Sequence, residues 1–132
     1  MAPVVPDNGL SLLLVEDSAV LAERLCELLS GIEGIHLAGI ADSEASALEA
    51  LAKNPIDLIL LDLHLRQGTG FGVLKEINKR PERPVVIIFT NYDLKEYRRA
   101  AMALGARYFL DKSSDMDHLP KLIESIRDGK AA

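Results

Sequence analysis

The sequence predicts an α/β fold, a single (βα)5 doubly wound domain in which helices flank a five-stranded parallel sheet. Two patterns support this. Five short apolar runs alternate with five segments whose apolar residues recur at helical spacing. The runs are almost continuously apolar, which is typical of strands buried on both faces of a parallel sheet. Because parallel strands need right-handed crossovers, the intervening helices should cover both faces.

The strands are expected at residues 10–15, 35–40, 56–61, 85–89 and 107–110. The fourth is the clearest, because all five of its residues are apolar and four are β-branched. The third is a continuous apolar run bounded by Asn54-Pro55 and by a glycine-containing stretch after Asp62. These boundaries favour strands over segments of buried helix.

The helices are expected between and after these strands, and each has a start or stop signal. The first begins near Ser18 and ends at Ser30-Gly31, and the second is capped by Asp42 or Ser43 and broken before Pro55. The third helix is expected from Phe71 to Arg80-Pro81. The fourth begins at an Asp93–Glu96 capping box and ends at Gly105. The fifth is indicated by apolar residues at helical spacing, namely Leu119, Leu122, Ile123 and Ile126.

Length and composition limit the class of protein. The 132 residues suit one domain with a sizeable core, and no apolar run approaches the roughly 20 residues of a membrane helix. A net charge of −5 argues against direct binding to nucleic acid, and the single Cys26 excludes an internal disulfide. We therefore expect a cytoplasmic protein with no membrane contact, a disordered lead at residues 1–9, a domain at 10–129 and a tail at 130–132.

Charged and hydroxyl side chains follow four of the predicted strands. Glu16 and Asp17 follow the first, Asp62 the third, Thr90 the fourth and Lys112 the fifth. Because ligand sites of such sheets lie beyond the carboxyl ends of the strands, we expect these side chains to converge. Neighbouring carboxylates repel one another and are neutralised well by a hard divalent cation such as Mg²⁺. An ionised carboxylate beside that cation can be a nucleophile toward phosphorus, while a hydroxyl and an ammonium contact the phosphoryl oxygens.

This pattern resembles the receiver domain of two-component response regulators over residues 9–129. The segments that carry the resemblance are residues 12–17, residues 60–65, Gly70, Thr90 and residues 105–112. The resemblance implies a flavodoxin-like sheet with the strand order 2-1-3-4-5. It also implies a phosphoacceptor that takes its phosphoryl group from a sensor histidine kinase or a histidine phosphotransfer protein.

The resemblance assigns a role to each residue of the site. Asp62 would be the phosphoacceptor, and Asp17, Asp62 and the main-chain carbonyl of His64 would bind Mg²⁺. Glu16 would support the metal through water, and Lys112 would bind the phosphoryl group. Thr90 would also contact that group and would form with Phe109 a switch pair. This pair would remodel a protein-interaction surface for a downstream protein or output domain, or for a phosphorylation-dependent homodimer.

Two departures from the family pattern lead to further expectations. Asn91 follows Thr90 where a small residue is more usual, and Tyr92 comes next. This bulk near Asp62 should slow hydrolysis of an aspartyl phosphate, with His64 contributing. Ser113 follows Lys112 where the family often has proline after a cis peptide bond. We expect a cis bond here as well, although it costs about 3 kcal/mol without proline.

Simpler explanations apply to several residues taken singly. An isolated Asp62 would be a solvated strand-end carboxylate, and the His64 side chain should point to solvent. Asp42, Asp93 and Asp115 are expected to be helix caps. Cys26 is expected to be a passive thiol.

Two other functions are weighed. A phosphorylation-independent interaction module is an alternative, but such proteins typically lose an acidic or lysine position of the site, and none is lost here. An aspartyl-phosphate hydrolase is less favoured, because such enzymes usually carry a second aspartate two residues after the nucleophile and His64 occupies that position. We therefore expect a signalling switch that catalyses only its own phosphorylation and slow dephosphorylation.

Overall fold

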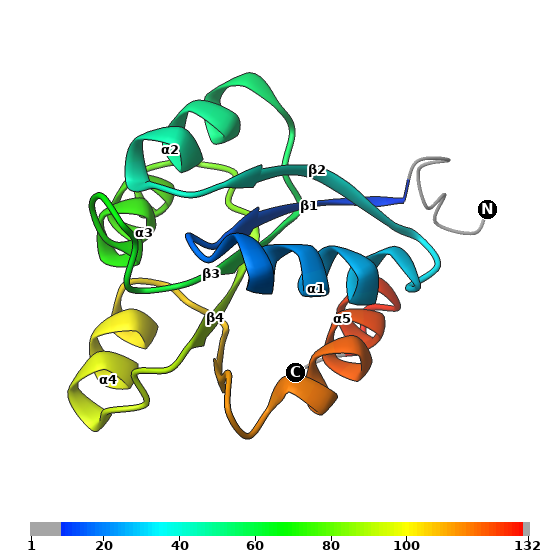
Figure 1. Ribbon diagram of the computed structural model, residues 1–132. Coiled ribbons are helices and arrows are strands. Elements are labelled where there is room, and N and C mark those ends of the chain that lie inside the picture. The colour runs from blue at the N-terminus through cyan, green and yellow to red at the C-terminus, as the bar shows by residue number, and fades with distance from the viewer. Residues whose placement is uncertain (1–8, 131–132) are drawn as a thin grey trace.

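Five parallel strands form one sheet in a computed structural model that describes residues 9–130 (Figure 1). The strand order is β2-β1-β3-β4-β5, which confirms the predicted doubly wound fold and its order 2-1-3-4-5. The strands are β1 (Leu10–Val15), β2 (Ile35–Ala41), β3 (Leu58–Leu61), β4 (Val85–Thr90) and β5 (Tyr108–Asp111).

Five α-helices connect and follow the strands, as the sequence predicts. They are α1 (Ala19–Ser30), α2 (Glu44–Lys53), α3 (Gly70–Asn78), α4 (Lys95–Ala103) and α5 (Leu119–Arg127), and a 3-10 turn, η1 (Met116–His118), precedes α5. Within residues 9–130, none of these helices has the length and apolar character needed to cross a membrane. Residues 1–8 of the predicted lead and the last two residues of the predicted tail lie outside the described part of the chain.

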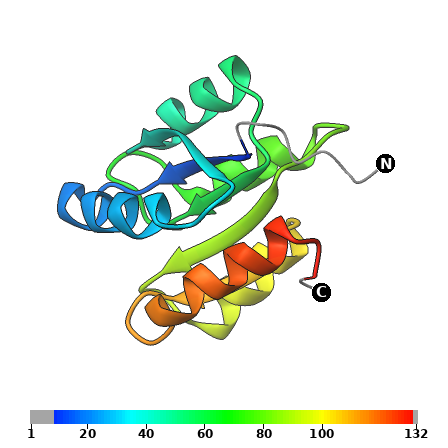
Figure 2. The same cartoon turned by 90° about the vertical axis from the view of Figure 1, so that its right-hand side faces the viewer.

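The sheet separates two hydrophobic layers. Helices α2, α3 and α4 cover one face, and α1 and α5 cover the other. Figure 2 brings α5 to the front, with α4 behind it. Alternate residues of each strand serve the two layers: Leu13 and Val15 pack with α2–α4, whereas Leu12 and Leu14 pack with α1 and α5. This alternation explains why the strand segments are apolar throughout.

Several predicted boundaries differ from the structure: β2, β4 and β5 each end one residue later than predicted, and β5 also begins one residue later. β3 begins at Leu58, two residues later than predicted, because Ile56 packs against the core from outside the strand. The Asp93–Glu96 capping box is wrong: α4 has Leu94 at its N-cap with no side-chain hydrogen bond, and Asp93 instead pairs with Arg98 at 2.9 Å.

The other predicted caps vary in outcome. Ser43, and not Asp42, caps α2 in a reciprocal pair of hydrogen bonds with Ser46. Asp115 occupies the N-cap position of η1 but makes no capping bond, because its carboxylate accepts from the main-chain N–H of Asp111 at 2.8 Å. Gly105 follows α4 with φ +103°, so the predicted glycine stop is confirmed.

The register of the sheet places the strand ends side by side. Val15 pairs with Leu61, Leu61 with Ile88, and Thr90 with Asp111. The carboxyl ends of β1, β3, β4 and β5 therefore lie at the same end of the sheet, which places Glu16, Asp62, Thr90 and Lys112 there. Parallel pairing thus converts a scattered set of sequence positions into one site.

Candidate functional site

Asp62 is the first residue after β3 and is buried, with 6% of its surface exposed. Its main-chain N–H donates to the Val15 carbonyl at 3.1 Å, so the end of β1 fixes its backbone. A Cβ on Gly70 would overlap the main-chain oxygen of Asp62. Only glycine therefore allows the start of α3 to pack this closely against the residue that bears the carboxylate.

Lys112 joins two of the predicted acidic residues. Its Nζ lies 2.5 Å from Glu16 Oε1 and 2.8 Å from Asp62 Oδ2. All three side chains are at least nine-tenths buried. Buried charges of this kind require partners, and each group here has one. The structure thus brings together residues 96 positions apart in the sequence, as the strand-end pattern predicts.

Three carboxylates form a cluster suited to a cation. Oxygen atoms of Glu16, Asp17 and Asp62 lie within 4.8 Å of one another. Lys112 pairs with two of these three carboxylates, so the set can accommodate the additional positive charge of a divalent ion. Carboxylate oxygens are the ligands that Mg²⁺ prefers, and the donor set therefore fits this ion. Within residues 9–130, no other group of three or more metal-ligating side chains meets this geometry.

The surroundings of Glu16 are less favourable for its negative charge than those of a surface carboxylate. Burial raises the pKa of Glu16, and the repulsion from Asp62 adds to this, although bonds from Lys112 and from the Ser18 N–H oppose the shift. Burial also lowers the pKa of Lys112, but hydrogen bonds to Asp62 and Glu16 outweigh this, so the net shift is upward. Lys112 therefore stays charged, while Glu16 is held in its ionised form at a cost in stability.

Thr90 and Phe109 lie inside the protein. Thr90 is fully buried, and its Oγ1 accepts from the main-chain N–H of Tyr92 at 3.2 Å. Phe109 belongs to the α2–α4 layer and is 7% exposed. The guanidinium of Arg98 lies 4.6 Å from the centre of the Phe109 ring. No pattern in the sequence indicates this contact between Arg98 and Phe109. The position of Arg98 relative to the aromatic ring depends on the tilt of α4 against β5, which has no sequence signal.

An aromatic stack lies beside the carboxylates. The exposed His64 side chain does point outward as predicted, but its ring stacks on Tyr92 at 3.7 Å between centroids, with 21° between planes. Tyr97 contacts both rings, at centroid distances of 6.0 and 6.2 Å. The bulk expected near Asp62 is therefore an ordered cluster that joins the loop after β3 to the loop after β4.

The prediction of a cis bond after Lys112 is wrong, because none of the described peptide bonds is cis. The turn after β5 is satisfied without it. The Asp111 carboxylate accepts from the Ser113 N–H at 2.8 Å and from the Ser113 hydroxyl at 2.6 Å. This local turn forms around a trans bond, so the protein avoids the cost of a non-proline cis bond.

Two comparisons of the sequence give the same family. The sequence model of the response regulator receiver domain matches residues 12–124, which is most of the chain. The transcriptional regulatory protein MalR of Bacillus subtilis is 30% identical over 118 residues, covering 89% of this chain and 50% of MalR. The sensory transduction protein LytT of Bacillus anthracis is 27% identical over 121 residues, covering 92% of this chain and 48% of LytT. The chain thus spans about half the length of these relatives.

The fold also matches solved structures. A LuxR-family two-component response regulator from Aurantimonas superposes with a TM-score of 0.84 at 24% identity, covering 94% of this chain and 89% of that one. The match supports the fold, and the sequence comparisons supply the family. With five parallel strands in the expected order and acidic residues at their carboxyl ends, the chain belongs to the receiver domain family of two-component response regulators.

Proposed function

We propose that Asp62 is the phosphoacceptor of this receiver domain, in a reaction that depends on Mg²⁺. The observation that carries the proposal is the buried Asp62 carboxylate, bound by Lys112 and flanked by Glu16 and Asp17. An aspartate with no chemical role would be more stable on the surface, where water solvates its charge. A nucleophile that must bear a dianionic phosphoryl group requires nearby positive charge.

The chemistry is an in-line transfer from a phosphohistidine. An oxygen of Asp62 attacks the phosphorus, the P–N bond breaks, and its electron pair remains on the imidazole of the donor. A metal held by Asp17, Asp62 and the His64 carbonyl, with Glu16 acting through water, would neutralise the phosphoryl oxygens. Lys112 then exchanges a carboxylate oxygen for a phosphoryl oxygen, and the Thr90 hydroxyl is the remaining donor.

The donor and the output are part of this proposal. The phosphoryl group comes from a sensor histidine kinase or a histidine phosphotransfer protein in the cytoplasm. Recruitment of Thr90 toward the phosphoryl group opens space for Phe109, and the surface around α4 and β5 changes. The relatives are regulatory proteins about twice as long, so the output belongs to an attached or separate partner, or to a homodimer that forms on phosphorylation.

Phosphorylation by a small donor tests the proposal directly. The protein is incubated with acetyl phosphate and Mg²⁺, and its intact mass is measured for wild type, Asp62→Asn and Asp57→Asn. Asp57 provides a matched control, because it precedes β3 at the opposite edge of the sheet and is exposed. We expect one phosphoryl group on wild type and on Asp57→Asn, and none on Asp62→Asn. An unmodified wild type would exclude Asp62 as a phosphoacceptor and favour a phosphorylation-independent interaction module.

A further inference from the structure

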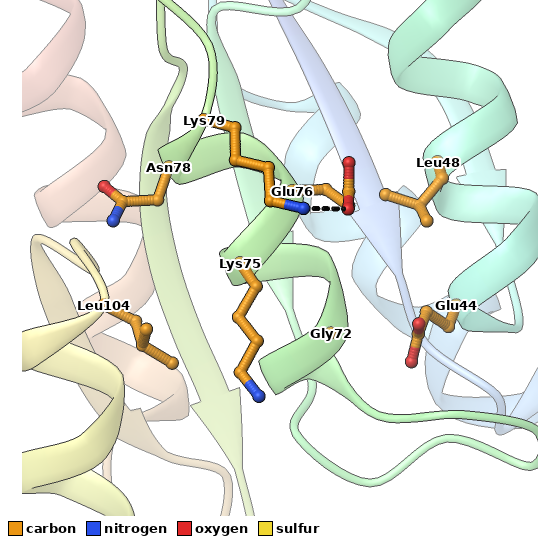
Figure 3. Close-up of a pocket in the computed structure, with 8 residues that line it drawn as sticks. All are labelled: Glu44, Leu48, Gly72, Lys75, Glu76, Asn78, Lys79 and Leu104. Atoms are coloured by element: carbon orange, nitrogen blue, oxygen red, sulfur yellow. Dashed lines mark hydrogen bonds and ion pairs between the residues drawn. The ribbon is translucent and has the colours of Figure 1, made fainter.

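Glu44, the first residue of α2, lies against the segment that follows Asp62. This segment, residues 62–69, is called the β3–α3 loop below. Figure 3 shows the Glu44 side chain directed toward Gly72 at the start of α3, along one end of a groove between α2 and α3. Glu44 is half-buried and is not a member of the carboxylate cluster. It does, however, form hydrogen bonds with the loop that carries two of the proposed metal ligands, Asp62 and His64.

Two hydrogen bonds attach Glu44 to the β3–α3 loop. The Thr69 N–H donates to Glu44 Oε1 at 3.0 Å, and the Glu44 N–H donates to the Gln67 carbonyl at 3.0 Å. Side chain and main chain of one residue thus bind the loop at two points. A carboxylate next to the first turn of α3 is also favoured by the exposed N–H groups of that turn.

Two glycines leave the space that Glu44 occupies. A Cβ on Gly72 would overlap the carboxylate of Glu44, and a Cβ on Gly68 would overlap its Cβ. Gly68 also has φ +82°, a conformation that other residues rarely adopt. The loop and the start of α3 are therefore shaped around this one side chain.

The attachment point is directly coupled to the site. Thr69 pairs with His64 in an isolated antiparallel bridge, and the Gly70 N–H donates to the Leu63 carbonyl at 2.9 Å. The carbonyl expected to bind the metal is that of His64. A bond from Glu44 to Thr69 therefore reaches His64 through a single pairing of main chains.

Glu44 itself is held in place by the start of its helix. Ser43 and Ser46 form a reciprocal capping pair, with the Ser46 N–H donating to Ser43 Oγ at 3.1 Å. This cap fixes the first turn of α2, on which Glu44 stands. Glu44 is thus held by a capped helix end, and its hydrogen bonds hold the loop in turn.

We propose that Glu44 is a positioning residue that sets the geometry of the β3–α3 loop and thereby the affinity of the site for a divalent cation. The inference rests on the proposed function, since it concerns the same site. Residues that orient metal ligands change metal affinity by about 10- to 100-fold when removed. Because Glu44 acts through the backbone, we expect the lower end, about tenfold.

The test uses Mg²⁺ alone as the probe. The dissociation constant is measured by NMR, from the shifts of amides in the β3–α3 loop, for wild type, Glu44→Ala and Glu49→Ala. Glu49 is the matched control, because it lies on the same helix and forms an exposed ion pair with Lys53, at 2.6 Å. We expect about tenfold weaker binding for Glu44→Ala and no change for Glu49→Ala.

A second variant separates positioning from loss of charge. Gly72→Ala keeps the Glu44 carboxylate but displaces it, so it should weaken Mg²⁺ binding like Glu44→Ala. Gly31→Ala is its control, because a Cβ there would make only one ordinary van der Waals contact, with the Leu28 carbonyl oxygen at 3.5 Å. In the metal-free protein, hydrogen exchange at the Thr69 and Gly70 amides should accelerate in Glu44→Ala and Gly72→Ala.

The outcomes distinguish the two proposals. If wild type binds Mg²⁺ and accepts phosphate, but Glu44→Ala binds Mg²⁺ as wild type does, the positioning role is wrong and the proposed function stands. A lower melting temperature with unchanged affinity also excludes the positioning role, because it assigns Glu44 a purely structural contact. If wild type binds no Mg²⁺, the proposed function fails first.

Discussion

The ion pairs of Lys112 allow a quantitative prediction. Lys112→Met retains the length of the side chain but removes the one positive charge bonded to Glu16 and Asp62. Three carboxylates within 4.8 Å then face one another without that charge. We therefore expect the metal-free protein to be strongly destabilised at neutral pH.

The magnitude follows from the burial of the partners. Removal of one member of a buried ion pair costs about 3–5 kcal/mol. The site lies at the edge of the sheet, where water can approach, so we expect the lower end, about 3 kcal/mol. For a domain of this size, that corresponds to a fall in melting temperature of about 10 °C.

The assay is urea unfolding and thermal melting, each with EDTA and with Mg²⁺. Lys79→Met is the matched control, because Lys79 forms an exposed pair with Glu76 at 3.0 Å and should change stability by less than about 1 kcal/mol. Mg²⁺ at about a hundredfold excess over its dissociation constant should restore about 2.7 kcal/mol. The variant should respond to lower Mg²⁺ concentrations than wild type, because its site is more negative.

The pH dependence provides a further check on the same variant. Acid protonates the carboxylates and removes their repulsion, so the difference between Lys112→Met and wild type should shrink as the pH falls below about 5. A metal-free Lys112→Met protein within about 1 kcal/mol of wild type at neutral pH would refute the reasoning. It would show that the carboxylates tolerate one another without the lysine.

Three other variants test separate features of the site. Glu16→Gln should be more stable than wild type at neutral pH in EDTA. Because the pKa of Glu16 is raised in the folded protein, the stability that Glu16 contributes is present below its unfolded pKa and is lost as the pH rises through its folded pKa. The two proteins should therefore have the same stability in acid, and equal stability at all pH values would contradict this reasoning. Gly70→Ala should lose about 3 kcal/mol or more by urea unfolding, since its Cβ meets the backbone of Asp62 and Leu63, and a well-folded variant would show that α3 can move. Tyr92→Ala should shorten the lifetime of the aspartyl phosphate severalfold, because loss of the stack with His64 admits water to the phosphoryl group. The lifetime is measured by mass spectrometry as a function of time. An unchanged lifetime would show that the stack does not shield the phosphoryl group.

Much of the fold was predictable because local and global signals agree. Periodicity located each strand and helix, and parallel pairing then required that Asp62 and Lys112 approach each other. The approach of Glu16, Asp62 and Lys112 to one another was predictable for the same reason, since each follows the end of a strand. Sequence patterns failed where a side chain could form either of two hydrogen bonds of similar strength. Asp93 bonds to Arg98 instead of capping α4, and the choice depends on the path of the loop.

Contacts between helices were beyond the reach of sequence patterns. Glu44 has the sequence context of an ordinary acidic residue in the first turn of a helix. Its hydrogen bond to Thr69 depends on the distance between α2 and α3, which the packing of the layer decides. The glycine at position 72 was the available clue, because it makes room for a neighbour that the sequence alone does not name.

The division of the interior by the sheet has a consequence for how signals leave the domain. Phe109 packs only in the layer of α2, α3 and α4, while α1 and α5 rest on the opposite face. If Phe109 repacks as proposed, the surface around α4 would change shape while the surface around α1 would not. Under the proposed switch, a protein that docks beside α1 would therefore meet the same surface before and after phosphorylation.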